Sequence, residues 1–473
     1  NFSMETIQQT INGTPAASGS STVTISRNGD LVHRVYVTLI GTSVTKGSNI
    51  VSEVELEIGG QRIDRHYEEW MNIWNELSTP ESKALALKAM QCDVGTGVTT
   101  GVGNVQVPLQ FWFCRNPGLA LPLIALQYHE VKLKFTWGSS HGGGVSGAQV
   151  WCDYIYLDTD ERRRFAQVSH EYLIEQIQKE TLTDASGDHK LNFNHPVKEL
   201  VWTSSKDYTD AKLVLNGHDR FAAQEEEYFQ LRQPFDYHTA VPKQNLPTAV
   251  ATSTLAFSSY SNQTFKSDWS DGTEATLTTI DTVSTTASAI AYSSNSLTVN
   301  GPSGSIVSTT NFVVGRRVAI VITDQANTDA FTGGTTAVGD VFFATITGTA
   351  TVDNTSANNT LTVPITNFVG GSSGAIELTT IDAGTGTNKA FLYYIEGGDN
   401  SAQARTSQMT DKINVYSFGL KPEEHQPSGT CNFSRIDNAQ LHFTAVQGDG
   451  NIYAVNYNVL RIMSGMGGLA YSN

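Results

Sequence analysis

The sequence predicts an all-β protein with two tandem β-sandwiches, short helices in the loops, and a β-rich insertion in the second sandwich. Three observations lead to this fold class. Gly is frequent, with 41 of 473 residues, and Ser, Thr and Asn fill long stretches, which is typical of many short strands joined by turns. Residues 342–352 and 361–366 alternate between apolar side chains and mostly Thr side chains. A degenerate duplication also runs along the chain.

Length and charge limit the classes of protein to consider. A chain of 473 residues is long enough for two or three domains with large cores. The formal net charge of −16 repels free nucleic acid, so direct nucleic-acid binding is disfavoured. No apolar run reaches the ~18 residues of a membrane-spanning helix, and no signal peptide is evident. Because the chain begins at Asn1 rather than Met, we expect an upstream segment to be missing.

The duplication consists of six matches that occur in the same order in both halves of the chain. Both halves pass from strand-like segments to a Gly-Gly or Asn-Gly turn, where positive φ is accessible. The matched residues are Ile7 and Ile177, Leu31 and Leu200, Gly60 and Gly217, Phe111 and Phe418, Phe135 and Phe443, and Tyr154 and Tyr457. Their offsets are 170, 169, 157, 307, 308 and 303 residues. We interpret the halves as two copies of one all-β unit.

The length of the repeat indicates the architecture. About 170 residues are too many for a solenoid repeat or a propeller blade. An antiparallel sandwich of about eight strands fits, and the jelly roll is the commonest such layout. The increase in offset from 157 to 307 places a large insertion in the second copy. We predict a first jelly roll at 1–165, a second at 166–242 and 396–473, and an inserted β-rich loop domain at 243–395.

Both copies change to a helical pattern after the turn. In the first copy, four apolar residues recur at i, i+3, i+4 and i+7, on one face of a predicted helix: Trp70, Ile73, Trp74 and Leu77. The Ser-Thr-Pro-Glu sequence at 78–81 predicts the start of a second short helix that runs through Met90. The counterpart in the second copy is Glu-Glu-Glu-Tyr-Phe at 225–229.

The inserted segment is predicted to fold on itself. Residues 342–352 and 361–366 alternate on either side of a turn, which predicts a hairpin with one core face and one solvated face. Residues 314–322 predict a further strand, so 305–385 is expected to form a small barrel or sandwich. The stretch 245–305 is either part of that fold or a polar linker.

Motifs that would indicate an enzyme or a metal site fail on inspection. Ser140 and His141 lie in a Gly-x-Ser-x-Gly pattern, but a nucleophile elbow needs a helix directly after the Ser, and a Gly-rich run follows here. The His-Glu pairs at 129–130 and 170–171 lack the second His of a zinc helix. No catalytic, cofactor-binding or metal-binding residue is predicted, and no cofactor.

Cysteines and sequons provide two further expectations. The four cysteines have no close or ligand-like spacing, and we expect reduced, mostly buried thiols at Cys92, Cys114, Cys152 and Cys431. Sequons in the insertion are expected to be exposed, which makes three residues candidate glycosylation sites: Asn262, Asn354 and Asn358.

Five segments carry a resemblance to a known family. They are 5–13 (ETIQQTING), 25–31 (ISRNGDL), 194–200 (NHPVKEL), 427–438 (PSGTCNFSRIDN) and 457–469 (YNVLRIMSGMGGL). Together they resemble the major capsid proteins of the nucleocytoplasmic large DNA viruses, and the algal-virus branch in particular. The resemblance spans nearly the whole chain outside the insertion.

The resemblance implies a structural role in the outer capsid shell of a virion. It implies two jelly rolls per chain, homotrimers that form pseudo-hexagonal capsomers of an icosahedral shell, and assembly in the host cytoplasm. The implied partners are neighbouring capsomers, penton proteins and minor capsid proteins, with an internal membrane reached only indirectly. Simpler family members have shorter loops in place of the insertion, so a contact of 243–395 with a host surface stays a separate possibility.

Two other functional classes stay open at this point. Jelly rolls also form lectins, so a carbohydrate-binding or surface-attachment protein is the main alternative. An enzyme on the same scaffold is the third.

Overall fold

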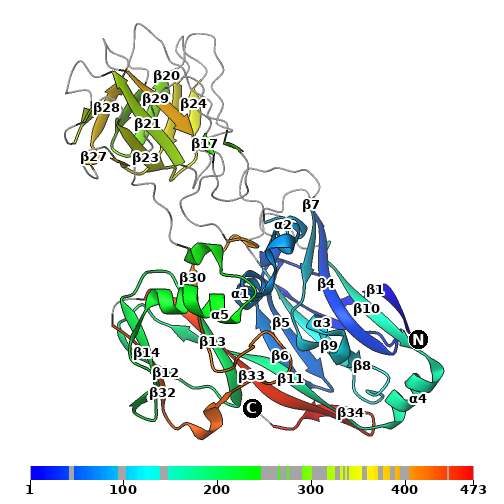
Figure 1. Cartoon of the computed structure of the whole chain (residues 1–473). Helices are drawn as coiled ribbons and strands as arrows, with labels where there is room; N and C mark the ends of the chain where they lie inside the picture. The colour runs from blue at the N-terminus through cyan, green and yellow to red at the C-terminus, as the bar shows by residue number, and fades with distance from the viewer. Residues whose placement is uncertain are drawn as a thin grey trace. The chain divides into compact units, whose positions relative to one another are not determined.

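The computed structural model describes residues 2–41, 47–93, 103–138, 147–246, 265–266, 274–275, 290–300, 317–324, 331–333, 336–337, 340–353, 360–370, 376–383, 389–394, 404–444 and 447–471. The chain divides into two compact units, one of Asn1–Leu246 with Ala402–Asn473 and one of Pro247–Ser401. The first unit contains two β-sandwiches side by side, one coloured blue to cyan and the other green and red (Figure 1).

The first sandwich is built from ten described strands. They are β1 (Phe2–Gln9), β2 (Ile11–Asn12), β3 (Ser20–Thr24), β4 (Leu31–Gly41), β5 (Val51–Ile58), β6 (Gln61–Tyr67), β7 (Gly103–Pro108), β8 (Leu121–Pro122), β9 (Val131–Trp137) and β10 (Gln149–Leu157). One sheet has the order β1-β10-β4-β7, with β8 beside β4, and the other has the order β2-β3-β9-β5-β6. All of these pairings are antiparallel.

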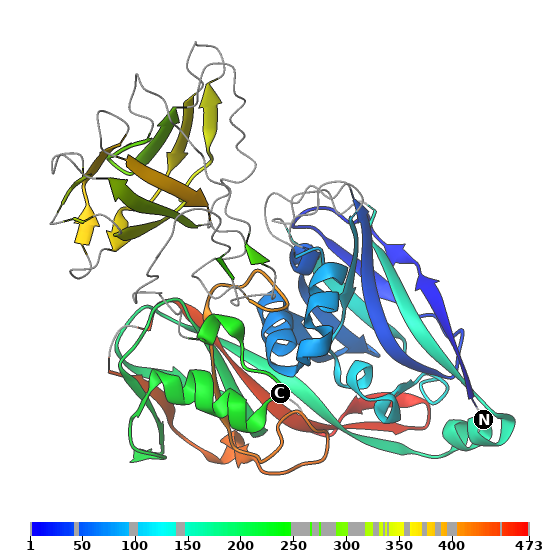
Figure 2. The same ribbon diagram turned by 45° about the horizontal axis from the view of Figure 1, so that its top comes forward.

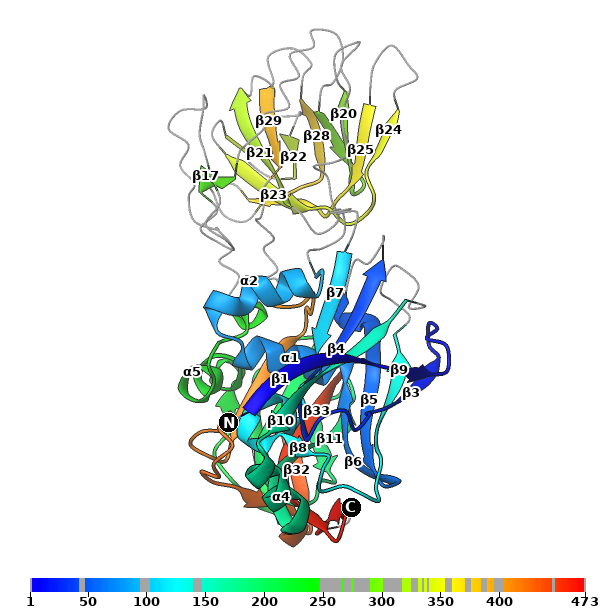
Figure 3. The ribbon, with the colours of Figure 1, turned by 90° about the vertical axis from the view of Figure 1, so that its right-hand side faces the viewer.

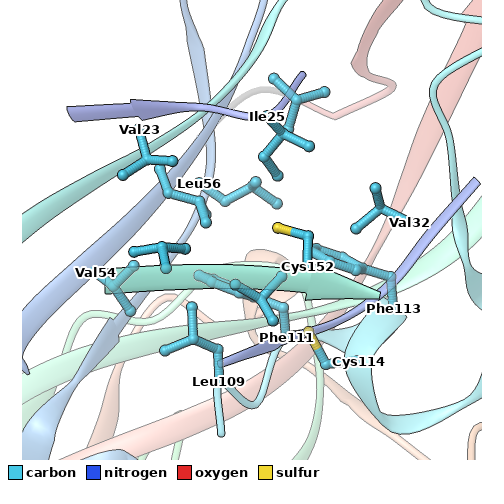
Figure 4. Close-up of a cluster of buried hydrophobic side chains, with 14 of the residues drawn as sticks. Val23, Ile25, Val32, Val54, Leu56, Leu109, Phe111, Phe113, Cys114 and Cys152 are labelled. Atoms are coloured by element: carbon cyan, nitrogen blue, oxygen red, sulfur yellow. The ribbon is translucent and has the colours of Figure 1, made fainter. Parts of the chain in front are cut away.

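Its short helices lie in the connections, as predicted. They are η1 (Gly47–Ile50), α1 (Glu68–Ser78), α2 (Glu81–Met90), α3 (Trp112–Arg115), η2 (Pro117–Leu119) and α4 (Thr159–Gln167). Alternating apolar residues of both sheets point inward, among them Val54, Leu56 and Cys152, and they pack around Phe111 and Phe113 (Figure 4). This core also takes in Ile174, Leu460 and Ile462 from β11 (His170–Leu182) and β33 (Gly450–Met463), two strands that continue into the second sandwich.

The second sandwich repeats this arrangement. Its strands are β11 (His170–Leu182), β12 (Gly187–Leu191), β13 (Pro196–Ser204), β14 (Asp210–Leu215), β15 (His218–Asp219), β16 (Gln224–Glu225), β30 (Lys412–Ser417), β31 (Cys431–Asn432), β32 (Ala439–Phe443), β33 (Gly450–Met463) and β34 (Met466–Leu469). Its helices are η3 (Tyr228–Arg232), α5 (Gln233–Tyr237), η4 (Lys243–Asn245) and η6 (Phe433–Arg435). The sheet orders are β11-β33-β13-β30 and β12-β32-β14-β15, which are the orders of the first sandwich. The all-β prediction with two similar sandwiches is confirmed.

The strand pairings test the predicted duplication residue by residue. In one sheet, Leu56 pairs with Leu133 and Leu213 pairs with Leu441. The offsets are 213 − 56 = 157 and 441 − 133 = 308, as predicted from the sequence.

In the other sheet the predicted register was wrong. The core-facing pair Val35–Cys152 corresponds to the core-facing pair Leu200–Ala454, so the offsets are 165 and 302 instead of 169 and 303. Side chains alternate between the faces of a strand, so an offset in error by one residue places the wrong face against the core. Both copies carry a β-bulge in this sheet, an irregularity that the sequence pattern does not mark.

The second unit contains a small β-sandwich and a separate two-stranded sheet of Phe265–Lys266 with Glu274–Ala275. Its strands are β17 (Phe265–Lys266), β18 (Glu274–Ala275), β19 (Ile290–Ser293), β20 (Ser296–Asn300), β21 (Arg317–Asp324), β22 (Phe331–Thr332), β23 (Val341–Thr345), β24 (Thr351–Asp353), β25 (Thr360–Pro364), β26 (Phe368–Gly370), β27 (Ile376–Leu378), β28 (Thr380–Ala383) and β29 (Lys389–Tyr394). The sheets β22-β28-β19-β20-β25-β24 and β27-β26-β23-β21-β29 enclose a core that includes Phe342 and Val363.

The hairpin predicted over 342–366 forms in part, at β24 with β25 and at an antiparallel bridge between Ile346 and Ile365. β24 pairs with β25, but β23 belongs to the other sheet, where it pairs with β21 and β26. The chain passes between the sheets at 346–350. Both sheets of a sandwich have the same inward alternation, so the pattern cannot tell one sheet from the other. The strands β19 and β20 lie within 245–305, the stretch that the sequence left open between a polar linker and part of this fold. Both strands belong to the sandwich.

The predicted burial of the cysteines holds for two of the four, because Cys92 and Cys431 are only half-buried. All four cysteines are free, and Cys114 and Cys152 are buried. Burial raises the pKa of Cys114 to about 12. Among the described residues, no helix is long and apolar enough to cross a membrane.

Candidate functional site: the junction between the two jelly rolls

Helix α1 lies at the junction between the two jelly rolls (Figure 2). It follows β6 of the first jelly roll, and its predicted apolar face packs against the outer face of the β11-β33-β13-β30 sheet of the second. Four side chains of α1 and six of that sheet form one buried cluster: Trp70, Ile73, Trp74, Leu77, Ile177, Val201, Ile413, Val415, Tyr453 and Val455. Burying a large apolar side chain contributes about 1.5–3 kcal/mol, so this contact holds the two jelly rolls in a fixed relation.

Glu69 adds hydrogen bonds to this apolar contact. Its carboxylate accepts hydrogen bonds from three donors of the second jelly roll: Thr203 Oγ1 at 2.9 Å, Asn451 Nδ2 at 2.6 Å and the Tyr453 hydroxyl at 2.5 Å. Hydrogen bonds to a charged acceptor are among the stronger ones in proteins. Glu69 therefore fixes the register of α1 along the sheet.

A buried ion cluster joins the jelly rolls at a second place. Glu175 of β11 accepts hydrogen bonds from Arg115 Nη2 of the first jelly roll at 2.7 Å and from Lys198 Nζ at 2.5 Å. Burial alone would raise the pKa of Glu175, but the charges of Arg115 and Lys198 outweigh it and lower the pKa. The carboxylate therefore stays charged, and the removal of either cation would leave it with a single partner in a buried site.

Asp64 of β6 forms a third link. Its Oδ1 accepts the backbone N–H of Ile177 at 3.1 Å, and its Oδ2 lies 2.8 Å from His66 Nε2. The His66 ring stacks on Phe111, with centroids 4.4 Å apart. These contacts tie β11 of the second jelly roll to the core of the first.

Glu76 connects α1 to the segment that follows residue 403. The side chain is fully buried and accepts backbone N–H groups of Arg405 at 3.0 Å, Thr406 at 2.7 Å and Ser407 at 3.1 Å. The Thr406 hydroxyl adds a bond of 2.7 Å. The chain enters β30 in this way, so Glu76 sets where the second jelly roll resumes.

Inside the second jelly roll, a buried His bridges two carboxylates. His238 Nε2 lies 3.0 Å from Glu199 and its Nδ1 lies 2.9 Å from Glu423. Burial alone would lower the pKa of His238, but Glu199 and then Glu423 raise it to about 9. At neutral pH the imidazolium links β13 to the loop that precedes β31.

The sequence-predicted glycosylation candidates cannot be placed. Asn262, Asn354 and Asn358 lie outside the described residues, as do Ser140 and His141. In the described part of the chain, no group of three or more His, Cys, Asp or Glu side chains is arranged to hold a metal ion. The charged groups of the junction are engaged with one another, an arrangement that suits a rigid joint.

Sequence reasoning found the apolar face of α1 but missed the junction carboxylates. Glu69, Glu76 and Glu175 resemble solvent-exposed acids in a chain with many of them. One signal was available, because both copies place Glu-Glu before an aromatic residue at the start of the helix, at 68–70 and 226–228.

Comparisons with known proteins identify the family. Over its full length the chain is 38% identical to the major capsid protein of Pyramimonas orientalis virus and covers 91% of that protein. The chain belongs to the major capsid protein family of large eukaryotic DNA viruses. Residues 1–158 match the family described as major capsid protein N-terminus, and 161–210 with 400–468 match the large eukaryotic DNA virus major capsid protein.

Further comparisons agree with this assignment. The major capsid protein of Paramecium bursaria Chlorella virus 1 is 33% identical, with 100% of this chain and 92% of that protein covered. A chain of the PBCV-1 virus capsid superposes with a TM-score of 0.58 at 28% identity, covering 100% of this chain and 97% of that chain. The chain is thus a structural capsid protein of a virion that assembles with other capsid copies. This role replaces the carbohydrate-binding alternative.

Proposed function

We propose that this capsid protein forms homotrimers, that each trimer is a pseudo-hexagonal capsomer, and that these capsomers tile an icosahedral shell. The observation that carries the proposal is the rigid junction, which holds two similar jelly rolls side by side in one chain. A threefold axis acting on two similar domains generates six similar corners, as a hexagonal lattice requires.

In this proposal each part of the chain has its own role. Residues 1–165 form one corner, and 166–242 with 396–473 form the next. Residues 243–395 form a decoration on the outer surface, where Asn262, Asn354 and Asn358 are available to glycosylating enzymes and the host surface is within reach. The separate core of the second unit supports this division, because a domain that folds on itself is tolerated in a loop.

The remaining partners follow from the same role. Neighbouring capsomers meet the trimer side to side, and penton and minor capsid proteins contact it beneath the shell, after assembly in the host cytoplasm. The net charge of −16 supports a shell that does not bind the genome directly.

We also propose that the chain has no catalytic function. Ser140→Ala and His141→Ala should leave stability and assembly unchanged, because both residues lie in a predicted hairpin loop. An esterase rate that disappears in Ser140→Ala would contradict this.

Electron microscopy of the purified protein tests the capsomer directly. Class averages should show particles with a hexagonal outline and threefold symmetry. Fields of small two-lobed particles of the single chain, at every concentration tried, would contradict the proposal.

A further inference from the structure

The two jelly rolls differ in what covers the outer face of one sheet. In the second jelly roll, Val201 pairs with Tyr453, and α1 buries both side chains completely. The corresponding pair in the first jelly roll is Tyr36 with Trp151. Within the described residues these two side chains are only half-buried, and Gln106 of the adjacent strand is exposed. Figure 3 looks onto this sheet, which contains β1, β4 and β10.

The second jelly roll carries a helix in the position of α1. Residues 68–70 (Glu-Glu-Trp) follow β6, and residues 226–228 (Glu-Glu-Tyr) follow β16, at an offset of 158. This offset is one more than the 157 of the preceding strands, so the helices occupy equivalent places. The residues that correspond to the buried face of α1 are Tyr228, Leu231, Arg232 and Phe235.

This second helix presents its face to solvent. The four residues and Glu227 line one open surface groove. The Phe235 side chain is 78% exposed, whereas its counterpart Leu77 is fully buried. Within the described residues, α1 thus has its apolar face on a sheet of the other jelly roll, whereas η3–α5 packs on β30 of its own jelly roll and leaves the corresponding face open, and no described helix covers the corresponding face of the first jelly roll's sheet.

We infer that η3–α5 of one copy packs on the outer face of the β1-β10-β4-β7 sheet of the next copy, with Glu227 bound by Thr38, Gln149 and Trp151. This inference rests on the proposed trimer and names the surface that forms it. The occupant is a second copy of this chain, because the groove and the sheet face are the unfilled halves of a contact that the chain already makes internally.

The polar groups of the two faces match. Glu69 is held by a hydroxyl, a primary amide and a phenol. The first jelly roll has donors at the three corresponding positions, Thr38, Gln149 and Trp151, and the Trp151 indole N–H, which donates to Gln149 Oε1 at a long 3.3 Å, would turn to the incoming carboxylate. The indole N–H of Trp151 replaces the phenol O–H as a donor. The Glu227 side chain is exposed and forms no hydrogen bond or ion pair with any residue that the structure describes.

Two differences between the two copies concern charge. Arg232 of the second copy corresponds to Trp74 of the first at the helix offset of 158. Asp153 of the first copy corresponds to Val455 of the second at the strand offset of 302. Trp74 and Val455 belong to the same buried cluster. Opposite charges thus stand where the internal contact has two apolar side chains, which favours this pairing of faces.

The geometry of the contact also fits closure. In the internal contact, the helix of the first jelly roll packs on the sheet of the second. In the inferred contact, the helix of the second jelly roll packs on the sheet of the first jelly roll of the next chain. A head-to-tail contact of this kind forms a ring when the rotation closes. With two jelly rolls per chain, three chains give six equivalent contacts around the ring.

Cross-linking tests the inferred surface in the full-length protein. We would combine Glu227→Cys with Gln149→Cys and treat the protein with a short bis-maleimide, using the two single variants and the unchanged protein as controls for the native thiols. Denaturing gels should show covalent dimers and trimers and no larger species with the double variant alone. Cross-linked dimers without trimers would indicate a two-fold contact and overturn the inference, as would the absence of specific products.

A charge exchange provides an independent measurement. Arg232→Asp and Asp153→Arg should each raise the trimer dissociation constant at least tenfold, and the double variant should restore it. Phe235→Ser should weaken trimers, whereas Leu420→Ser should not, although Leu420 is 73% exposed on the same jelly roll. If the unchanged protein is monomeric, the proposed trimer fails. If it is trimeric and none of these variants alters assembly, this inference alone is wrong.

Discussion

Replacement of Glu76 by Ala should destabilise the first unit strongly. The fully buried carboxylate accepts three backbone N–H groups and two hydroxyls from Arg405, Thr406 and Ser407. A hydrogen bond to a charged group contributes about 1.5–3 kcal/mol, and bonds that share one carboxylate are not additive. Because the Ala variant leaves buried donors without an acceptor, we expect a loss of about 3–5 kcal/mol.

The Gln variant separates charge from geometry. Four of these bonds end on Oε1 and one on Oε2. A Gln carbonyl can take the place of Oε1, so Glu76→Gln should cost only about 1–2 kcal/mol. Glu81→Ala is the matched control, since Glu81 is 84% exposed and pairs with the same Arg405 at 3.2 Å. An exposed ion pair contributes under about 1 kcal/mol.

Urea unfolding followed by Trp fluorescence measures these differences, because Trp70 and Trp74 lie in the junction cluster. Protomer concentration must be the same for all variants, since association adds to apparent stability. If Glu76→Ala and Glu81→Ala lose equal amounts, the buried carboxylate does not hold the segment and the account of this link is wrong.

Three further predictions concern pH, the insertion and the thiols. His238 has a pKa of about 9 in the folded protein, against an ordinary value of 6.5. Its charged form therefore stabilises the fold by about 3 kcal/mol below pH 6.5, and this stabilisation is lost as pH rises through 9. Denaturation midpoints that stay constant from pH 7 to 10 would refute this. Replacing 247–401 by a short Gly/Ser linker should leave trimers with shortened protrusions in micrographs, whereas trimers that dissociate would show a clasp. Cys114 and Cys152 should react with iodoacetamide only after unfolding, and rapid labelling of the native protein would be inconsistent with their burial.

The sequence was sufficient for the architecture because duplication and alternation are global signals. The turns at 59–60 and 216–217, the apolar face of α1 and the order of strands all follow from spacing and residue type. In the sheet that contains β4 and β10, the predicted offset was wrong by four residues at Val35 and by one residue at Cys152. The reason is that β-bulges shift the register without any change in hydrophobic pattern.

The junction was harder to predict for a different physical reason. Glu69 and Glu76 are stabilised by donors more than 130 residues away in the chain, and nothing local distinguishes a buried Glu from an exposed one. The Glu175 cluster has the same character, since its cations come from α3 and β13. Pairings of this kind depend on the relative placement of two folded domains, which local patterns do not encode.

The mass of the protein in solution tests the central claim most directly. Light scattering coupled to gel filtration should give about 154 kDa, three times the chain mass of 51.2 kDa, as a threefold capsomer requires. A particle of 51.2 kDa at micromolar concentration, unchanged in crowded or high-salt buffer, would contradict the account.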